Sequence, residues 1–210
     1  MRTIARIPVR HAALALAVVV LAPFVPATNA RAATTLTFKT DPVLGTLTGV
    51  TLNGQTQTTT TTTSLNDFAV KSSGSNAGWN MTVQSVSTGG KSSVFKEYCP
   101  NTTCGTDSGP GYVSGGYTLP ADSLTLDTSG ASMAGGTGTA PSFTCSTSPF
   151  CDVDTTTATK VVSATTAASL ATWTSSGNST LTLTTPANLH KLQTGEVYEV
   201  NLVWTLTSGP

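Results

Sequence analysis

Apolar and polar residues alternate with a period of two along most of this chain. The pattern is clearest near the end, in Tyr198, Val200, Leu202, Trp204 and Leu206. Residues two apart in a strand point to the same face. Shorter runs lie near 36–38, 47–52, 94–98, 123–126, 159–163, 168–173 and 181–183, separated by Gly, Pro and Ser. With no helix of ten or more residues expected after the N-terminal region, the pattern predicts an all-β fold: an antiparallel β-sandwich or barrel-like domain of many short strands.

Two of the three Trp residues stand in near-copies of one motif. The copies are Gly78-Trp79-Asn80-Met81-Thr82-Val83 and Leu202-Val203-Trp204-Thr205-Leu206. Their far separation in sequence indicates two strands of one domain whose ends come together. Each motif puts Trp on the same strand face as an aliphatic side chain, which favours core packing over stacking on a ligand. The candidate binding residues Trp79, Met81, Trp204 and Leu206 are therefore expected to be core residues first.

Two further segments give local predictions. Phe68 and Val70 lead through a Gly/Ser-rich loop at 71–78 to the strand of Trp79, which predicts a β-hairpin. The run Thr58–Thr63 is expected to be a Thr-rich edge strand or loop within the domain, and the alternative is a flexible or O-glycosylated tract.

The N-terminal region has the pattern of a secretory signal peptide. Arg2, Arg6 and Arg10 precede an apolar run over 12–25, and Ala30-Arg31-Ala32 offers a cleavage site. The run is short for a membrane span, although an uncleaved anchor remains the alternative. We expect residues 1–32 to be the signal peptide and 33–210 to be a single secreted domain with no membrane span after cleavage.

Charge narrows the possible partners of the mature chain. All four Arg residues lie within 1–32, which leaves six Lys against ten Asp and Glu. Such a chain has no basic patch to displace counterions from a nucleic acid, so we expect no nucleic-acid partner. The last residues show no hydrophobic tail or sorting-type tail, and no Cys lies near the cleavage site. Attachment at the cell surface is thus expected to be non-covalent.

The four Cys residues form two close pairs, Cys99 with Cys104 and Cys145 with Cys151. Three connectivities are possible, and export makes disulfides the default. We favour bridges within each pair because each closes a small loop of turn residues. A four-thiolate zinc site is the alternative, but the spacings are longer than C-x2-C and no His is near.

The sequence offers little catalytic chemistry. His190 is the one His outside the signal peptide, and we expect it to be an exposed loop residue, because no Ser nucleophile motif accompanies it. Asp152 and Asp154 lack the further ligands of a Ca²⁺ loop. We therefore predict a non-enzyme without metal or cofactor. A cleft with two close carboxylates would favour an extracellular hydrolase instead.

The two Trp motifs resemble those of WxL-domain proteins, secreted surface proteins of Gram-positive bacteria. The first family motif, a strand, a Gly-rich turn and Gly-Trp-x-Leu-Thr-Val, corresponds to 67–83, and the second corresponds to 181–210 with Gly195-Glu196-Val197-Tyr198 and the Trp204 motif. Met81 stands in place of the family Leu, a volume-conserving change. An acidic-x-Arg-Gly segment before the first Trp is absent here, and the Cys loops are not part of the family pattern.

The resemblance covers the mature chain and implies a secreted protein held non-covalently on the cell wall. The implied partner is peptidoglycan or another wall polymer, with other exported surface proteins as further partners. Because the mature chain is acidic and has no Arg, contact with wall glycan would depend on hydrogen bonds, aromatic contacts or bridging cations. The alternative function is that of a structural or adhesive partner in an extracellular complex that does not bind glycan directly.

Overall fold

The computed structural model describes residues 2–3, 13–21, 35–45, 47–63, 65–73, 78–147, 150–165 and 171–209. The expected cleavage site after Ala32 lies outside these residues. Nineteen strands and one short 3-10 turn, η1 (Leu65–Asp67), form the regular structure. The described part contains no helix long and apolar enough to cross a membrane.

The strands are short until the last one. The first ten are β1 (Arg2–Thr3), β2 (Ala13–Leu21), β3 (Leu36–Thr40), β4 (Leu47–Thr51), β5 (Gln57–Thr63), β6 (Ala69–Ser72), β7 (Trp79–Ser85), β8 (Lys96–Cys99), β9 (Thr103–Cys104) and β10 (Asp107–Ser108). The others are β11 (Gly111–Tyr112), β12 (Leu124–Asp127), β13 (Ala131–Ala134), β14 (Ser142–Phe143), β15 (Cys151–Asp152), β16 (Thr159–Ala164), β17 (Ala171–Gly177), β18 (Ser179–Thr185) and β19 (Val197–Ser208).

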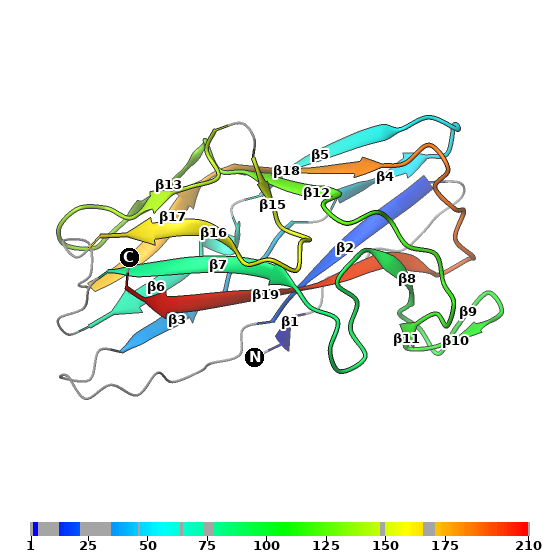
Figure 1. Ribbon diagram of the computed structural model, residues 1–210, viewed down its shortest axis with the longest axis horizontal. Coiled ribbons are helices and arrows are strands. Elements are labelled where there is room, and N and C mark those ends of the chain that lie inside the picture. Colours follow the sequence, from blue (N-terminus) through cyan, green and yellow to red (C-terminus); the bar gives the residue numbers. More distant parts are fainter. Residues whose placement is uncertain are drawn as a thin grey trace.

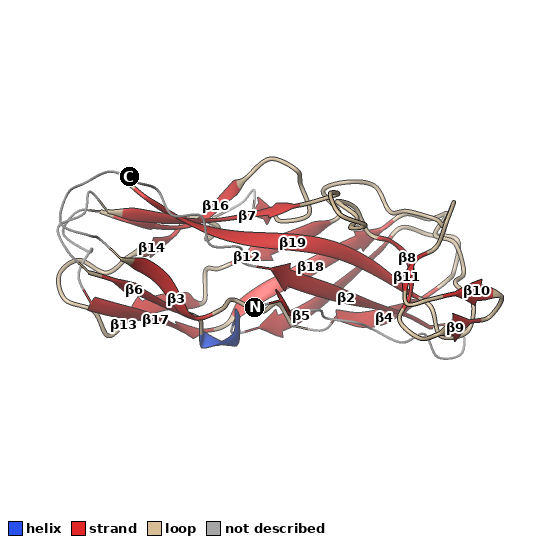
Figure 2. Cartoon of the chain, turned by 90° about the horizontal axis from the view of Figure 1, so that it is seen from below, coloured by secondary structure: helices blue, strands red, loops and turns tan. Residues whose placement is uncertain are grey.

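The strands form an all-β sandwich, as predicted. The largest sheet runs β1-β2-β19-β7-β16-β14, with β8 and β11 beside the start of β19 and β4 beside β2. Two four-stranded sheets, β13-β17-β6-β3 and β15-β12-β18-β5, supply the opposite side of the core. Figure 2 shows β7, β16 and β19 as one layer above β3, β6, β13 and β17. Each sheet has open edges, so the sandwich alternative holds rather than the barrel-like one.

Strand pairing is antiparallel with one exception among the described pairs. Strand β2, which lies within the expected signal peptide, runs parallel to β19 and pairs with its residues 198–203. Strand β5 forms the edge of its sheet beside β18, which confirms the prediction of an edge strand for the Thr run. Its residues alternate between exposed and half-buried, as expected of a strand with one face toward solvent.

The hairpin predicted between Phe68 and Val83 is wrong. Strand β6 pairs with β3 and β17, whereas β7 pairs with β16 and β19 in the largest sheet. The chain therefore crosses from one layer of the sandwich to the other between β6 and β7. A Gly/Ser-rich loop permits either connection, so the loop sequence alone does not decide between a hairpin and a crossover.

One continuous hydrophobic core lies between the layers. Its largest fully buried side chains are Trp79, Trp204, Tyr198, Phe68 and Phe95. The third Trp, Trp173, is also buried and belongs to the same cluster. Burial of this apolar area is the main stabilising contribution to a fold with so little helix.

Candidate functional site

The two Trp motifs lie side by side in the largest sheet. Strands β7 and β19 are antiparallel neighbours (Figure 1), with Trp204 opposite Val83 and Leu206 opposite Met81. Trp79, Met81 and Trp204 are each 0% exposed, and Leu206 is partly buried against the core. The prediction that these residues pack in the core is confirmed. A ligand on the surface has no access to either indole ring.

The glycine of the first motif has a steric role. Gly78 has a φ of +94°, a region that other residues rarely adopt. A Cβ at this position would overlap the backbone carbonyl oxygen of Ala164, the last residue of β16. Gly78 therefore lets β7 begin close against β16 and sets Trp79 at the start of the strand.

Both predicted disulfides are confirmed. Cys99 pairs with Cys104 and Cys145 with Cys151, with Cα–Cα separations of 5.6 and 5.1 Å. The four sulfur atoms are therefore not available as zinc ligands. Among the described residues, no three His, Cys, Asp or Glu side chains are arranged to hold a metal ion.

Asp154 is held by the backbone rather than offered to a cation. Its carboxylate oxygens accept hydrogen bonds from the amides of Ser123 and Leu124, both at 3.0 Å. Burial raises the pKa of Asp154 to about 6 in spite of these two hydrogen bonds, which favour its charged form. Its neighbour Asp152 is half-buried, and burial also raises the pKa of that carboxyl. The pair supports the start of β12.

A partly open pocket of about 440 Å³, here called the loop pocket, lies on the surface. It is lined by Tyr117, Thr118, Leu119, Pro120, Pro186, Asn188, Leu189, His190 and Tyr198. Tyr117 and His190 stack, with ring centroids 3.4 Å apart and planes inclined by 15°. Tyr117 is 53% exposed, and Phe150 at 39% is the other large apolar residue exposed in the described part.

Backbone pairing fixes the Tyr117 side of the pocket. The amide of Glu97 donates to the carbonyl of Tyr117 at 2.9 Å, and the amide of Leu119 donates to the carbonyl of Phe95 at 2.8 Å. Glu97 also accepts a hydrogen bond from the amide of Tyr117 at its side chain, at 3.0 Å. The segment that carries Tyr117 is thus held against β8 on both sides of the ring.

The other side of the pocket belongs to the connection between β18 and β19. The hydroxyl of Tyr198 donates to the carbonyl of His190 at 3.3 Å, and the amide of Leu189 donates to the carbonyl of Pro186 at 3.1 Å. These bonds shape a compact loop at the end of the molecule where β8 to β11 gather, on the right in Figure 1.

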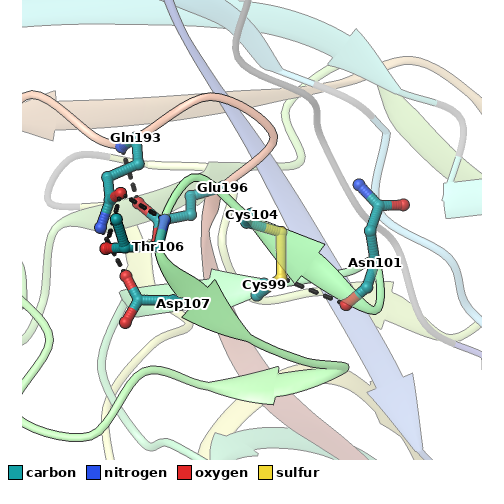
Figure 3. Close-up of a disulfide and its surroundings, with 7 residues drawn as sticks. All are labelled: Cys99, Asn101, Cys104, Thr106, Asp107, Gln193 and Glu196. Atoms are coloured by element: carbon teal, nitrogen blue, oxygen red, sulfur yellow. Dashed lines mark hydrogen bonds between the residues drawn. A yellow bond between two sulfur atoms is a disulfide. The ribbon is translucent and has the colours of Figure 1, made fainter.

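Gln193 ties this loop to the first disulfide loop (Figure 3). Its side-chain oxygen accepts hydrogen bonds from the amide of Thr106 at 2.8 Å and from the Thr106 hydroxyl at 3.1 Å. Its side-chain nitrogen donates to Asp107 at 2.5 Å, and its amide donates to Glu196 at 2.6 Å. Gly105, with a φ of +59°, allows this contact because a Cβ there would overlap the Gln193 side chain.

Glu196 is fully buried behind the loop pocket. Burial raises its pKa to about 8, with further raising contributions from the carboxyls of Glu97 and Asp107. Burial likewise raises the pKa of the Tyr198 hydroxyl, and the nearby Glu97 adds to that effect. At neutral pH Glu196 is therefore mostly protonated, and the Tyr198 hydroxyl, which belongs to the pocket lining, is neutral.

The chemistry of the loop pocket is that of a neutral polar ligand site. Its nine lining residues include no Lys, Arg, Asp or Glu. They supply one exposed aromatic pair, two prolines and the side-chain amide of Asn188. An uncharged pocket of this size can take a small or segmental ligand, whereas an anionic polymer would meet no cation there.

Sequence reasoning placed His190 correctly in an exposed loop but did not identify Tyr117, Asn188 or the prolines. Tyr117 follows Gly115-Gly116 and precedes Pro120 by three residues, a single aromatic residue in a turn-rich stretch outside the alternating pattern. A large aromatic residue outside any strand pattern is the feature of the sequence that could have indicated Tyr117 as a surface site residue. Its stacking partner, far along the chain, could not be inferred without the fold.

Comparisons of the chain with models of protein families, with curated proteins and with solved structures find no match.

Proposed function

We propose that this chain is an exported, non-enzymatic protein of the bacterial cell surface that attaches non-covalently to wall peptidoglycan through the loop pocket. The observation that carries the proposal is the exposed Tyr117–His190 stack at the mouth of a pocket without charged side chains. An aromatic face offers a broad apolar surface for a sugar ring, and the Asn188 amide can donate to and accept from an acetamido group.

Three further features support this function. The resemblance of the two Trp motifs to those of WxL domains implies wall attachment. Two disulfides are typical of proteins that work outside the reducing cytosol. The burial of Trp79 and Trp204 leaves Tyr117 as the most exposed large aromatic side chain in the described part.

A hydrolase is less well supported, although two carboxyl groups do lie close together. Glu97 lies opposite Tyr198, and Glu196 stands two residues before Tyr198 in the chain, whereas glycosidases place their two carboxyls on either side of the scissile bond. Neither residue lines the pocket, and both are buried. The two carboxyls thus lack the access that hydrolysis of a glycan requires.

The test is sedimentation with purified peptidoglycan sacculi. The full protein is mixed with sacculi at several salt concentrations and centrifuged, and the bound fraction is measured in the pellet. We expect saturable binding that varies little with salt, because the pocket contains no charged side chain. Protein that stays in the supernatant under all conditions would contradict the proposal, and co-purification with a defined surface protein would then favour the adhesive-partner alternative.

A further inference from the structure

The two aromatic residues of the loop pocket are carried by separate segments, and in each segment one backbone amide donates to a buried carboxyl group. Tyr117 belongs to the stretch after β11, and His190 to the connection before β19. Glu97 holds the first segment and Glu196 the second. Both glutamates are nearly inaccessible to solvent, at 5% and 0% exposure.

Glu97 fixes the backbone directly at Tyr117. Its side-chain oxygen Oε2 accepts from the amide of Tyr117, and its own amide donates to the carbonyl of the same residue. The position of the Tyr117 ring therefore follows the position of the Glu97 carboxyl. Gly116 leaves room for this arrangement, because a Cβ there would lie 2.9 Å from Oε2 of Glu97.

Glu196 closes the loop that carries His190. Its oxygen Oε2 accepts from the amide of Gln193 at 2.6 Å, only three residues along the loop from His190. Gln193 in turn bonds Thr106 and Asp107, as Figure 3 shows. Gln193 is thus the point at which this loop and the first disulfide loop meet, and the Glu196 carboxyl holds its backbone amide.

The second oxygen of Glu196, Oε1, is buried and accepts no hydrogen bond from the described residues. Strand register brings Glu97 close to it: Glu97 of β8 lies opposite Tyr198 of β19, two residues after Glu196, and its carboxyl also acts on the ionisation of Glu196. Two ionised carboxylates cannot hydrogen-bond, since neither has a donor, and they repel each other at low local dielectric. A proton on Glu196 supplies the missing donor toward Glu97. The raised pKa of Glu196, about 8, agrees with this arrangement.

We propose that Glu97 and Glu196 form a proton-linked positioning pair that holds Tyr117 against His190 while Glu196 keeps its proton, and releases the stack when that proton is lost. Only the consequence for glycan binding rests on the function proposed above. The pair joins the segment of Tyr117 to the segment of His190. Ionisation of Glu196 would therefore separate the two rings without unfolding the sandwich.

The groups that face Glu196 agree with loss of the contact on ionisation. Glu97 from β8 and Asp107 from β10 act against its negative charge, and the amide of Gln193 is the one contribution that lowers the Glu196 pKa. Tyr198 from β19 lies close to both glutamates, and Tyr117 lies close to Tyr198. An ionised Glu196 would therefore meet two carboxyl groups and be stabilised by a single amide.

The test uses NMR of the His190 ring in the full-length chain between pH 5.5 and 9.5, without any glycan. Stacking on Tyr117 shifts the ring-proton resonances of His190, and Tyr117→Ala gives the unstacked reference. We expect the shift to decay toward this reference in a transition near pH 8. Each variant is compared with Tyr117→Ala at the same pH, so that only the contribution of stacking is followed.

Two conservative variants identify the groups responsible. Glu196→Gln keeps an acceptor for Gln193 and gains an NH₂ donor toward Glu97, so the alkaline transition should vanish while the rings stay stacked. Glu97→Gln removes one repelling carboxyl and should move the transition to lower pH. The same alkaline transition in the parent and in Glu196→Gln, or no alkaline transition in the parent, would overturn the proposal.

Sedimentation with sacculi at pH 6.5 and pH 9 then tests the link to function separately. The parent should lose bound protein at pH 9, and Glu196→Gln should bind equally at both values. If the NMR transition behaves as expected but nothing pellets at either pH, the positioning pair stands and the wall-binding function fails. Equal pelleting of the parent at both values would overturn the link.

Discussion

Trp204 shows why the most conspicuous residues of this sequence are not its binding site. The ring is 0% exposed, lies opposite Val83 of β7 and belongs to the continuous core. An aromatic residue that shares a strand face with aliphatic neighbours has the pattern of a core residue, so its burial can be predicted from the sequence. Tyr117 differs from the Trp residues in that its side chain is exposed to solvent.

The substitution Trp204→Ala should lower the free energy of unfolding by about 3–5 kcal/mol, because it leaves a large cavity between the layers. Phe150→Ala, at an exposed loop position, is the control and should change it by about 0.5 kcal/mol or less. Urea unfolding followed by circular dichroism measures both. A Trp204→Ala variant as stable as the parent would show that the ring does not support the core.

At the scale of elements, most strands could be predicted because each carries a period-two pattern bounded by turn residues. The core faces of β12 and β18 follow directly from their alternation, whereas the first six residues of β19 are buried on both faces, Glu199 and Asn201 included, which alternation does not indicate. The connection between β6 and β7 could not be predicted, since both strands have the same pattern and only tertiary packing assigns them to different sheets. The loop pocket was missed for a similar reason: its two sides lie far apart in sequence, and loops carry no periodicity.

Gly78 offers a test of how β7 is set against β16. Gly78→Ala combines a positive φ with overlap on the carbonyl of Ala164, whereas Gly54→Ala has a φ of +72° with nothing within 4 Å. Each substitution should lower the free energy of unfolding by about 1 kcal/mol because of the backbone conformation. Gly78→Ala should lower it clearly further, because its methyl group overlaps the carbonyl of Ala164. Thermal melts of the two variants measure the difference. Equal losses would mean that the chain relaxes around the new methyl group.

The first disulfide should matter more for the loop pocket than for the fold. It closes a loop of sequence separation 5, so chain entropy gives it about 2 kcal/mol of stabilisation. Its loss in the double variant Cys99→Ser/Cys104→Ser should leave a folded sandwich but loosen the contact between Thr106 and Gln193. Faster amide exchange at 101–108 and 189–196 than in the parent would show this. Unchanged amide exchange would mean that the disulfide is not what keeps Gln193 in contact with Thr106.

At the scale of the whole molecule, buried acids make stability depend on pH. Asp154 and Glu196 have pKa values of about 6 and about 8, above their ordinary values of 3.8 and 4.5. The folded state binds these two protons more tightly than the unfolded chain does. Their contribution to the free energy of unfolding is therefore fully present below about pH 4 and is lost as pH rises toward 8. Burial without a cationic partner is the physical cause.

Unfolding in urea at pH 5, 7 and 8.5 measures this dependence. The parent should lose stability steadily over this range, and the part above pH 6 should disappear in Glu196→Gln, whose side chain has no charge to bury. A parent that gains stability from pH 5 to 8.5 would contradict the assignment of these two buried acids.

The loop pocket, lined by the segment that pairs with β8 and by the connection that leads into β19, has no Lys, Arg, Asp or Glu among its lining residues. Attachment to the wall through that pocket is the central claim. Tyr117 is its most exposed aromatic residue, while Phe150 is the matched exposed aromatic residue outside it.

The most direct test is a sacculus sedimentation isotherm for the parent, Tyr117→Ala and Phe150→Ala, with a thermal melt of each variant to confirm folding. Loss of a central aromatic contact costs more than about 1.4 kcal/mol, so Tyr117→Ala should bind at least about tenfold more weakly. Phe150→Ala should bind like the parent. A folded Tyr117→Ala variant with the parent's isotherm would contradict the claim that the loop pocket attaches this protein to the wall.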